Sequence, residues 1–149
     1  MKSLVVYYSR TNITKRLAEN IAKELDCDIE EITSKVNYSG KIGYARGIKD
    51  AASAKIVDLE PLRYNPEDYD MVYVGVPVWV SKAANPAISY LKQNEGKFKN
   101  IKFFVTAGSS GFESTFEQME KYSIKPLKTL AVTTKDVKHE NYDLTSFLD

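Results

Sequence analysis

The sequence predicts an α/β fold: a three-layer, doubly wound domain with a five-stranded parallel sheet between two layers of helices. Five short apolar segments have the character of strands, and helical stretches separate them along the chain, which is the pattern of parallel sheets. Right-handed connections leave few arrangements for such a domain, and the strand order 2-1-3-4-5 is a common one. The chain has 149 residues, of which 43% are hydrophobic and 28% charged. These values fit one globular unit, so we expect a single domain over residues 1–149.

The first part of the chain supplies two strands and two helices. Residues 2–8 form a nearly continuous apolar run, as expected of a strand covered on both faces. An amphipathic helix is predicted over residues 12–26, because apolar side chains recur there at helical spacing. Residues 27–32 alternate and predict a less buried strand at a sheet edge. Residues 40–54 predict a second helix, although two glycines weaken it.

The rest of the chain supplies the other three strands. Residues 70–76 are rich in Val, Tyr and Met and form the most strand-like segment. Asn85 then offers a helix N-cap before Pro86 at the first helical position. Residues 101–106 predict the fourth strand and residues 127–133 the fifth.

Two more helices complete the predicted order. Ser114 and Glu117 have the spacing of a capping box, which predicts that a helix starts at Ser114. Leu144, Phe147 and Leu148 indicate a closing helix near the end of the sequence. The predicted helices therefore follow the predicted strands along the chain.

Composition and charge disfavour several classes of protein. Basic and acidic side chains number 21 and 20, for a net charge of +1, without the basic patch expected of a nucleic-acid-binding protein. Cys27 is the only cysteine and His139 the only histidine. We therefore expect no intramolecular disulfide, thiolate cluster or histidine-rich metal site. Any redox chemistry must come from an organic cofactor.

No segment predicts export or a membrane location. The apolar run near the N-terminus is too short for a signal-peptide core. The longest apolar stretch, residues 71–80, has about half the length of a membrane span. We expect a cytoplasmic protein with no membrane or nucleic-acid partner.

The loop after the first strand has the composition of a phosphate-binding turn. Residues 9–14 carry three hydroxyl side chains directly before the predicted helix, whose first N–H groups have no partners within the helix. A phosphate there would accept hydrogen bonds from these N–H groups and hydroxyls, at the positive end of the helix dipole. Ser and Thr are also ordinary helix caps, so both interpretations of this loop stay open. No G-x-G-x-x-G or P-loop lysine signature favours a dinucleotide or ATP.

Two further loops are candidates for holding a flat ligand. Residues 75–81, after the third strand, include Trp79, the only tryptophan, whose indole plane could support an aromatic ring system. Residues 106–112, after the fourth strand, combine two glycines with small hydroxyl residues, which lets the backbone approach a planar ligand closely. Taken singly, Trp79 could simply cover the end of the sheet, and the last loop could be a surface turn.

The three loops are more informative together than singly. They follow strands 1, 3 and 4, which are neighbours in the predicted order, and the carboxyl ends of parallel strands share one edge of the sheet. One loop supplies a phosphate cradle, and the other two supply an aromatic wall and closely approaching backbone. The combination predicts a phosphate-bearing planar heterocycle as the ligand.

In these loops, and over nearly its whole length, the chain resembles the flavodoxin family. Residues 8–11 with 14–15 resemble the family's phosphate-binding loop, residues 75–79 its first isoalloxazine loop, and residues 106–108 with 111–112 its second. The resemblance implies flavin mononucleotide (FMN) as the cofactor. The residues that it places around FMN are Ser9, Arg10, Thr11, Asn12, Ile13, Thr14, Pro77, Val78, Trp79, Val80, Ser81, Thr106, Ala107, Gly108, Ser109, Gly111 and Phe112.

Two positions depart from the family pattern. Asn12 stands where the family usually has glycine, and Asn is the other residue that best tolerates a left-handed backbone, so we expect the loop to close. Residues 78–82 contain no glycine, whereas many flavodoxins use a glycine there whose peptide flips on reduction. A flip here would require a positive φ at a β-branched or bulky residue. We therefore expect weak stabilisation of the one-electron-reduced flavin.

The resemblance implies electron transfer between redox partners, which can be proteins or small-molecule acceptors. FMN would supply the chemistry, so no catalytic side chain is expected. An alternative is an NAD(P)H-dependent quinone or flavin reductase, a class that commonly forms homodimers. A third possibility is a flavodoxin-like binding module that has lost FMN. Both a monomer and a homodimer are compatible with the sequence.

Overall fold

Strands and helices alternate along residues 1–149, all of which the computed structural model describes. The strands are β1 (Ser3–Tyr7), β2 (Asp28–Glu31), β3 (Met71–Trp79), β4 (Lys82–Ala83), β5 (Ile101–Ala107) and β6 (Thr129–Thr133). The helices are α1 (Ile13–Leu25), α2 (Gly40–Ala52), α3 (Asn85–Gln93), α4 (Phe112–Lys121), α5 (Thr134–Lys138) and α6 (Thr145–Leu148), with a 3-10 turn at Pro66–Asp68. None of these helices has both the length and the apolar character needed to cross a membrane.

The sheet confirms the predicted fold class. Its parallel strands follow the order β2-β1-β3-β5-β6, which is the predicted 2-1-3-4-5 order once the short β4 is set aside. β2 lies at one edge, as its weaker apolar pattern indicated, and β6 lies at the other. β4 pairs antiparallel with the end of β3 and forms a hairpin that the sequence did not predict. The carboxyl ends of β1, β3 and β5 are neighbours, at the edge where the ligand is expected.

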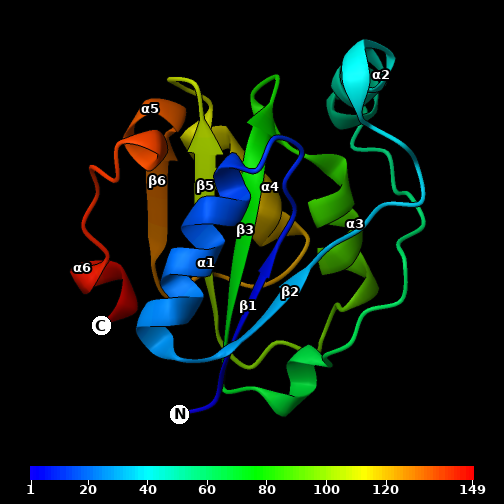
Figure 1. Ribbon diagram of the computed structural model, residues 1–149. Helices are drawn as coiled ribbons and strands as arrows, with labels where there is room; N and C mark the ends of the chain where they lie inside the picture. Colours follow the sequence, from blue (N-terminus) through cyan, green and yellow to red (C-terminus); the bar gives the residue numbers. More distant parts are fainter.

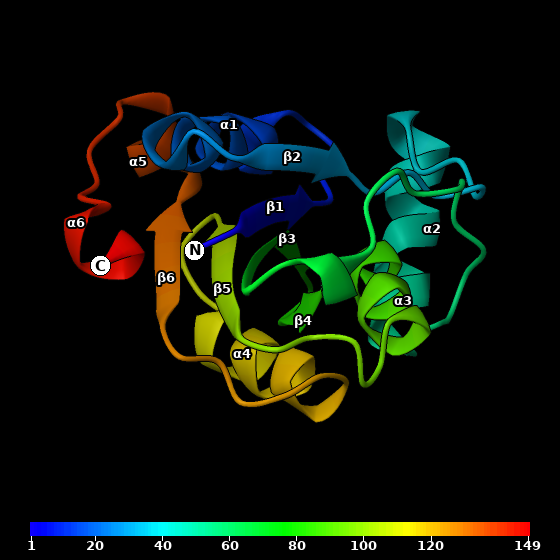
Figure 2. The same ribbon diagram turned by 90° about the horizontal axis from the view of Figure 1, so that it is seen from below.

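Helices cover both faces of the sheet (Figure 1, Figure 2), and an apolar layer lies on each face. In β1, Leu4 and Val6 point into one layer while Val5 and Tyr7 point into the other, because successive side chains of a strand alternate. The first layer includes buried residues of α3 and α4, and the second includes those of α1, α5 and α6. The strand is therefore buried on both faces, as its continuous apolar sequence predicted.

The third strand continues to Trp79, beyond its predicted end at residue 76, and Gly75 lies within it. A Cβ atom at Gly75 would lie 2.1 Å from ring atoms of the fully buried Phe104 on the neighbouring β5. This glycine leaves room for a large aromatic ring on the face of the sheet. The segment Pro77–Trp79, expected in a loop, also belongs to β3, because its end is paired with β4.

The helix predicted over residues 40–54 is confirmed as α2, and it stands at the carboxyl edge of the sheet (Figure 1). Gly43 and Gly47 of this helix face inward. A Cβ atom at Gly43 would lie 2.2 Å from the carbonyl carbon of Tyr38, and one at Gly47 would lie 3.0 Å from the Trp79 ring. Glycine lowers intrinsic helix propensity, but here it lets α2 approach the end of β3 closely.

The predicted N-cap of α3 is wrong. Asn85 is the first helical residue, and its side chain is fully buried. Its amide donates to the Tyr38 hydroxyl and to the Lys55 carbonyl, both at 3.0 Å. The Asn85 side chain therefore bonds to distant residues and does not cap the helix. Pro86 lies in the first turn, one position later than predicted.

The predicted capping box of α4 is also wrong. The helix begins at Phe112, two residues before Ser114, and Gly111 is its left-handed N-cap with φ of 92°. The Ser114 hydroxyl donates to the Ser81 carbonyl at 2.7 Å. A contact with the β3–β4 hairpin therefore replaces the expected local bond.

The closing helix predicted from Leu144, Phe147 and Leu148 is present as the short α6, which carries the buried Phe147. Helix α5, directly after β6, was not predicted. The side chain of Lys102 in β5 is buried beneath α6, and its ammonium donates to the Phe147 carbonyl at 2.7 Å. Burial lowers the pKa of Lys102 from its ordinary value. This lysine fastens the C-terminal helix to the sheet.

Candidate functional site

The turn between β1 and α1 exposes a run of unpaired backbone donors. None of the N–H groups of residues 9–15 donates to a backbone carbonyl, and the first that does is that of Arg16, to Asn12. Asn12 has φ of 67° and ψ of 6°, so the left-handed conformation expected of it is present. The first turn of α1 contains no acidic residue. These features together make a site for an anion at a helix N-terminus.

Hydroxyl groups line the same turn. Ser9 Oγ is buried and has no hydrogen-bond partner within the protein, a costly arrangement unless a ligand or water supplies the partner. Thr14 and Thr106 are both buried, and their hydroxyl oxygens lie 2.8 Å apart. The turn after β1 and the end of β5 are therefore in direct contact.

A slot begins at this turn and runs along the ends of β3 and β5. Its cavity has a volume of about 190 Å³. A smaller cavity of about 90 Å³ adjoins it between α2 and the hairpin, and shares Arg10, Tyr44, Val78 and Trp79 with it. The slot thus has a polar end at α1 and an apolar end at α2.

Trp79 forms part of the wall of both cavities and packs in an aromatic cluster. Its ring lies 5.5 Å from that of Tyr8 and 5.4 Å from that of Tyr38, with interplanar angles of 83° and 68°. Such edge-to-face pairs stabilise the orientation of an indole. Burial raises the pKa of Tyr38 to about 12 and also raises the pKa of Tyr8, so both hydroxyls stay protonated at neutral pH.

The β3–β4 turn holds two consecutive left-handed residues. Val80 has φ of 54° and Ser81 has φ of 63°, the pattern of a two-residue type I′ hairpin. Such a turn favours Asn and Gly, so a β-branched Val80 strains the backbone. The positive φ that was expected to be costly without a glycine is therefore already present at Val80 in this conformation.

Helix α4 holds the hairpin on both sides of this turn. The Ser114 hydroxyl donates to the Ser81 carbonyl at 2.7 Å, and the Ala83 N–H donates to Gln118 Oε1 at 2.8 Å. At the base of the helix, a Cβ atom at Gly111 would lie 2.9 Å from a Val78 methyl group. The second and third loops therefore form one packed unit.

Arg10 links the turn after β1 to α2. Its Nε donates to the Tyr38 carbonyl at 2.8 Å and its Nη2 to the Gly40 carbonyl at 2.9 Å. The guanidinium carbon lies 5.1 Å from the centre of the Tyr44 ring, within cation–π range. The side chain thus places a positive charge beside the slot while it fixes the start of α2.

The structure brings together residues from all three predicted loops. Those that line the 190 Å³ slot are Arg10, Thr11, Ile13, Thr14, Pro77, Val78, Trp79, Thr106, Ala107 and Gly108. Val80 lines the smaller cavity, and Ser9 lines a separate cavity of about 420 Å³ on the β2 side of the turn. Asn12, Ser81, Ser109, Gly111 and Phe112 line none of these three cavities.

Sequence reasoning missed four residues of the two cavities. Thr134 lines the slot from the start of α5, and its hydroxyl donates to the Ala107 carbonyl at 3.3 Å. It follows β6 at the same sheet edge, so the rule applied to the other strand ends would have found it. Tyr44, Gly47 and Ile48 come from α2. No local signal marked them, because the path of α2 over the slot depends on the tertiary fold.

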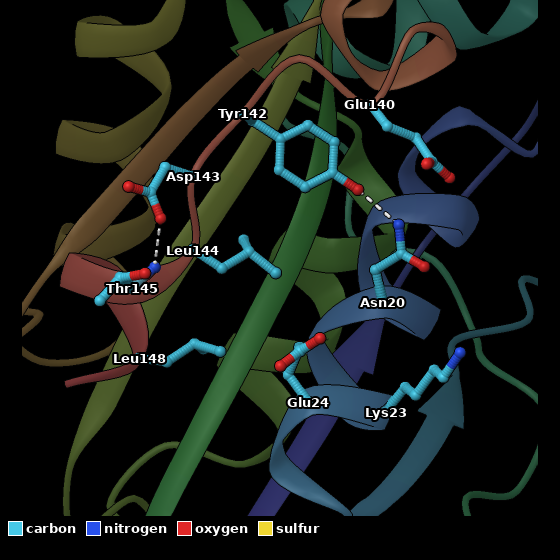
Figure 3. Close-up of a pocket in the computed structure, with 9 residues that line it drawn as sticks. All are labelled: Asn20, Lys23, Glu24, Glu140, Tyr142, Asp143, Leu144, Thr145 and Leu148. Carbon is cyan, nitrogen blue, oxygen red and sulfur yellow. Dashed lines mark hydrogen bonds between the residues drawn. The ribbon is translucent and has the colours of Figure 1, made fainter.

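The largest cavity lies elsewhere, between α1 and the C-terminal segment, with a volume of about 530 Å³ (Figure 3). Some of its polar side chains already have partners there: Asn20 donates to the Tyr142 hydroxyl, and the Asp143 carboxylate accepts from the Thr145 N–H. Carboxylates of Glu24, Glu140 and Asp143 border it, so it disfavours an anion. The predicted ligand therefore fits the smaller slot better.

Comparisons with known proteins agree with the fold. The family model described as flavodoxin matches residues 2–145. A flavoprotein from Lactobacillus acidophilus, solved in complex with FMN, is 18% identical with a TM-score of 0.74, and the match covers 95% of this chain and 99% of that one. A protein from Bacteroides uniformis assigned as a flavoprotein is 22% identical with a TM-score of 0.77, covering 94% and 97%.

A third similar structure, also assigned as a flavoprotein, comes from Bacteroides eggerthii. It is 20% identical with a TM-score of 0.76, and the match covers 97% of this chain and 96% of that one. Among curated proteins none matches significantly. Identities this low show a shared fold, whereas the family model matches nearly the whole chain. The protein therefore belongs to the flavodoxin family.

Proposed function

We propose that the protein binds FMN in the slot and transfers electrons between redox partners. The observation that carries this proposal is the unpaired donor run of residues 9–15, which reaches the polar end of a slot that passes Trp79. The orphaned Ser9 hydroxyl belongs to the same turn. A phosphate would satisfy these donors. FMN supplies the redox chemistry, because its ring accepts and donates one or two electrons.

The residues present fit both ends of the proposed ligand. The N–H groups of the turn and the Ser9 hydroxyl would hold the phosphate, with the charge of Arg10 nearby. Pro77–Trp79 and Thr106–Gly108 would flank the ring and limit its contact with water. The FMN complex of the similar Lactobacillus acidophilus flavoprotein supports the choice of this nucleotide.

The test is uptake of FMN by the purified protein, compared with uptake of riboflavin, which lacks the phosphate. We expect FMN to bind at least about a hundredfold more tightly, because a phosphate accepting several charge-assisted hydrogen bonds gains several kcal/mol. Quenching of Trp79 fluorescence and visible flavin absorbance report binding. Cofactor released by denaturation should be FMN rather than FAD.

Two variants locate the phosphate. Ser9→Ala should weaken FMN binding about tenfold, the value of one hydrogen bond to a charged group, and leave riboflavin binding unchanged. Ser110→Ala is the matched control, because it removes an exposed hydroxyl from the third loop. Equal binding of FMN and riboflavin, or no uptake of either, would refute the proposal.

Addition of NADPH to the FMN-loaded protein separates electron carrier from reductase. A carrier should keep its yellow colour with NADPH and lose it with dithionite. Rapid bleaching by NADPH alone would favour the reductase alternative.

A further inference from the structure

Charge is distributed unevenly along the chain although the total is nearly neutral. Residues 32–49, which lead into α2 and form most of it, contain four basic and no acidic side chains: Lys35, Lys41, Arg46 and Lys49. Residues 58–70, which lead into β3, contain five acidic side chains and one basic: Asp58, Glu60, Glu67, Asp68, Asp70 and Arg63. Of these two segments, the one that leads into α2 and forms most of it is basic, and the one that leads into β3 is acidic.

The solvent-facing side of α2 is cationic. Asp50 is its only acidic residue, and it is buried, where its carboxylate accepts a hydrogen bond from the Tyr38 hydroxyl at 2.7 Å. Lys41 and Lys49 are exposed and lie two four-residue steps apart, so they share one face of the helix. Gly43 and Gly47 keep the opposite face against the protein. No carboxylate of α2 offsets these two charges.

Exposed apolar side chains lie next to this basic face, at the mouth of the slot. Tyr44 is 57% exposed and Val80 is 56% exposed, and both line the smaller cavity beside Trp79. Lys82, also exposed, lies directly after the hairpin turn. An apolar centre with a charged rim is the anatomy of a protein–protein interface. A binding site for a small anion alone would not need these exposed apolar side chains.

We propose that Lys41, Lys49 and Lys82, arranged around Tyr44 and Val80, form a docking face for an acidic partner protein that carries a one-electron redox centre. This inference rests on the proposed function, since the partner would exchange electrons with FMN in the slot. Opposite charge would steer the partner onto the mouth of the slot. In the transfer step one electron leaves the reduced flavin and enters the redox centre of the partner. In a partner whose centre is an iron, the ferric ion becomes ferrous.

The test uses two haem proteins of opposite charge as probes, the acidic haem domain of cytochrome b5 and the basic cytochrome c. The FMN-loaded protein is reduced with dithionite and mixed with either ferric protein by stopped flow. As ionic strength rises from about 10 to about 150 mM, screening shortens the range of charge interactions. The rate with cytochrome b5 should fall, and the rate with cytochrome c should rise.

Charge reversal locates the face. The double variant Lys41→Glu/Lys49→Glu should slow the reaction with cytochrome b5 about tenfold at low salt. The matched control is Lys121→Glu/Lys125→Glu, which makes the same charge change at exposed positions near the end of α4, and its rate should change less than about twofold. Equal slowing by both variants, or a rate with cytochrome b5 that rises with salt, would overturn the proposal.

A binding measurement separates this inference from the cofactor. Titration of ¹⁵N-labelled protein with the cytochrome b5 domain, with and without FMN, should shift the amide signals of α2 and of the hairpin in both samples. If FMN fails to bind but these signals shift, the docking face stands and the proposed function fails. If FMN binds and other surfaces shift instead, the docking face is wrong.

Discussion

The hydroxyl groups of Thr14 and Thr106 lie 2.8 Å apart in a buried contact between residues 92 positions apart in the sequence. Thr14 belongs to the turn expected to hold a phosphate, and Thr106 to the strand end expected to flank a ring. The contact therefore fixes the position of the turn after β1 relative to the end of β5.

Removing either hydroxyl alone should destabilise the protein by more than half of the loss caused by removing both. Thr14→Val or Thr106→Val alone should lower the free energy of unfolding by about 1–3 kcal/mol, because the remaining hydroxyl loses its buried partner. The double variant should lose less than the sum of the two. Urea denaturation measures all three, with the exposed Thr11→Val as a control expected within about 0.5 kcal/mol of the parent protein. Strictly additive losses would contradict a direct bond.

Val80→Gly should stabilise the protein by about 0.5–1 kcal/mol. A non-glycine residue in the left-handed region costs about 1–2 kcal/mol, and the greater unfolded-state freedom of glycine returns part of that gain. Val78→Gly is the control, since Val78 lies in β3 without a positive φ and should lose stability. If thermal denaturation shows equal losses for both variants, the turn is not strained at Val80.

Gly75→Ala should destabilise the protein by about 1–3 kcal/mol, because the new methyl group overlaps the Phe104 ring. Phe104→Leu should also be destabilising alone, through loss of buried ring atoms. In combination the two should cost less than their sum, since leucine lacks the ring atoms nearest the methyl group. Gly108→Ala, where a Cβ atom meets nothing within 4 Å, should change stability little. A fully additive double variant would mean that the backbone, not the ring, resists the methyl group.

Stability should fall as pH rises above about 9. Burial raises the pKa of the Cys27 thiol from its ordinary value of 9.0 to about 11, so the folded state holds this proton more tightly than the unfolded state. The contribution is complete below about pH 9 and is lost as the pH approaches 11. Urea midpoints between pH 8 and 11 measure the decline, which should be shallower for Cys27→Ser. The buried Tyr38, with its pKa of about 12, extends the decline to higher pH in both proteins.

The fold was predictable because burial leaves a direct mark on each strand. Residues 2–8 and 101–106 are mostly apolar, and both strands proved buried on two faces. The errors arose where a long-range partner captured a side chain that has a common local use. Asn85 bonds Tyr38 rather than capping its helix, and Ser114 bonds Ser81. No local pattern contains that information.

The site was predictable to the extent that it lies at strand ends. The rule about carboxyl edges led to Thr14, Trp79 and Thr106, which the slot indeed brings together. It could not lead to Tyr44, because α2 reaches the slot through the close approach of Gly47 to the Trp79 ring. The glycines of α2 were a sign of this close approach. In the sequence, however, they were interpreted only as weakening the helix.

The attachment of the hairpin to α4 through Ser114 and Gln118 has a consequence for ligand selection. These two bonds tie the hairpin to α4, and the loop after β5 leads directly into the same helix at Gly111. A displacement of α4 should therefore carry both walls along together. The width of the slot should consequently stay constant while the surrounding structure fluctuates. The scaffold, rather than any single contacting side chain, should therefore discriminate flat molecules from thicker ones of similar polarity.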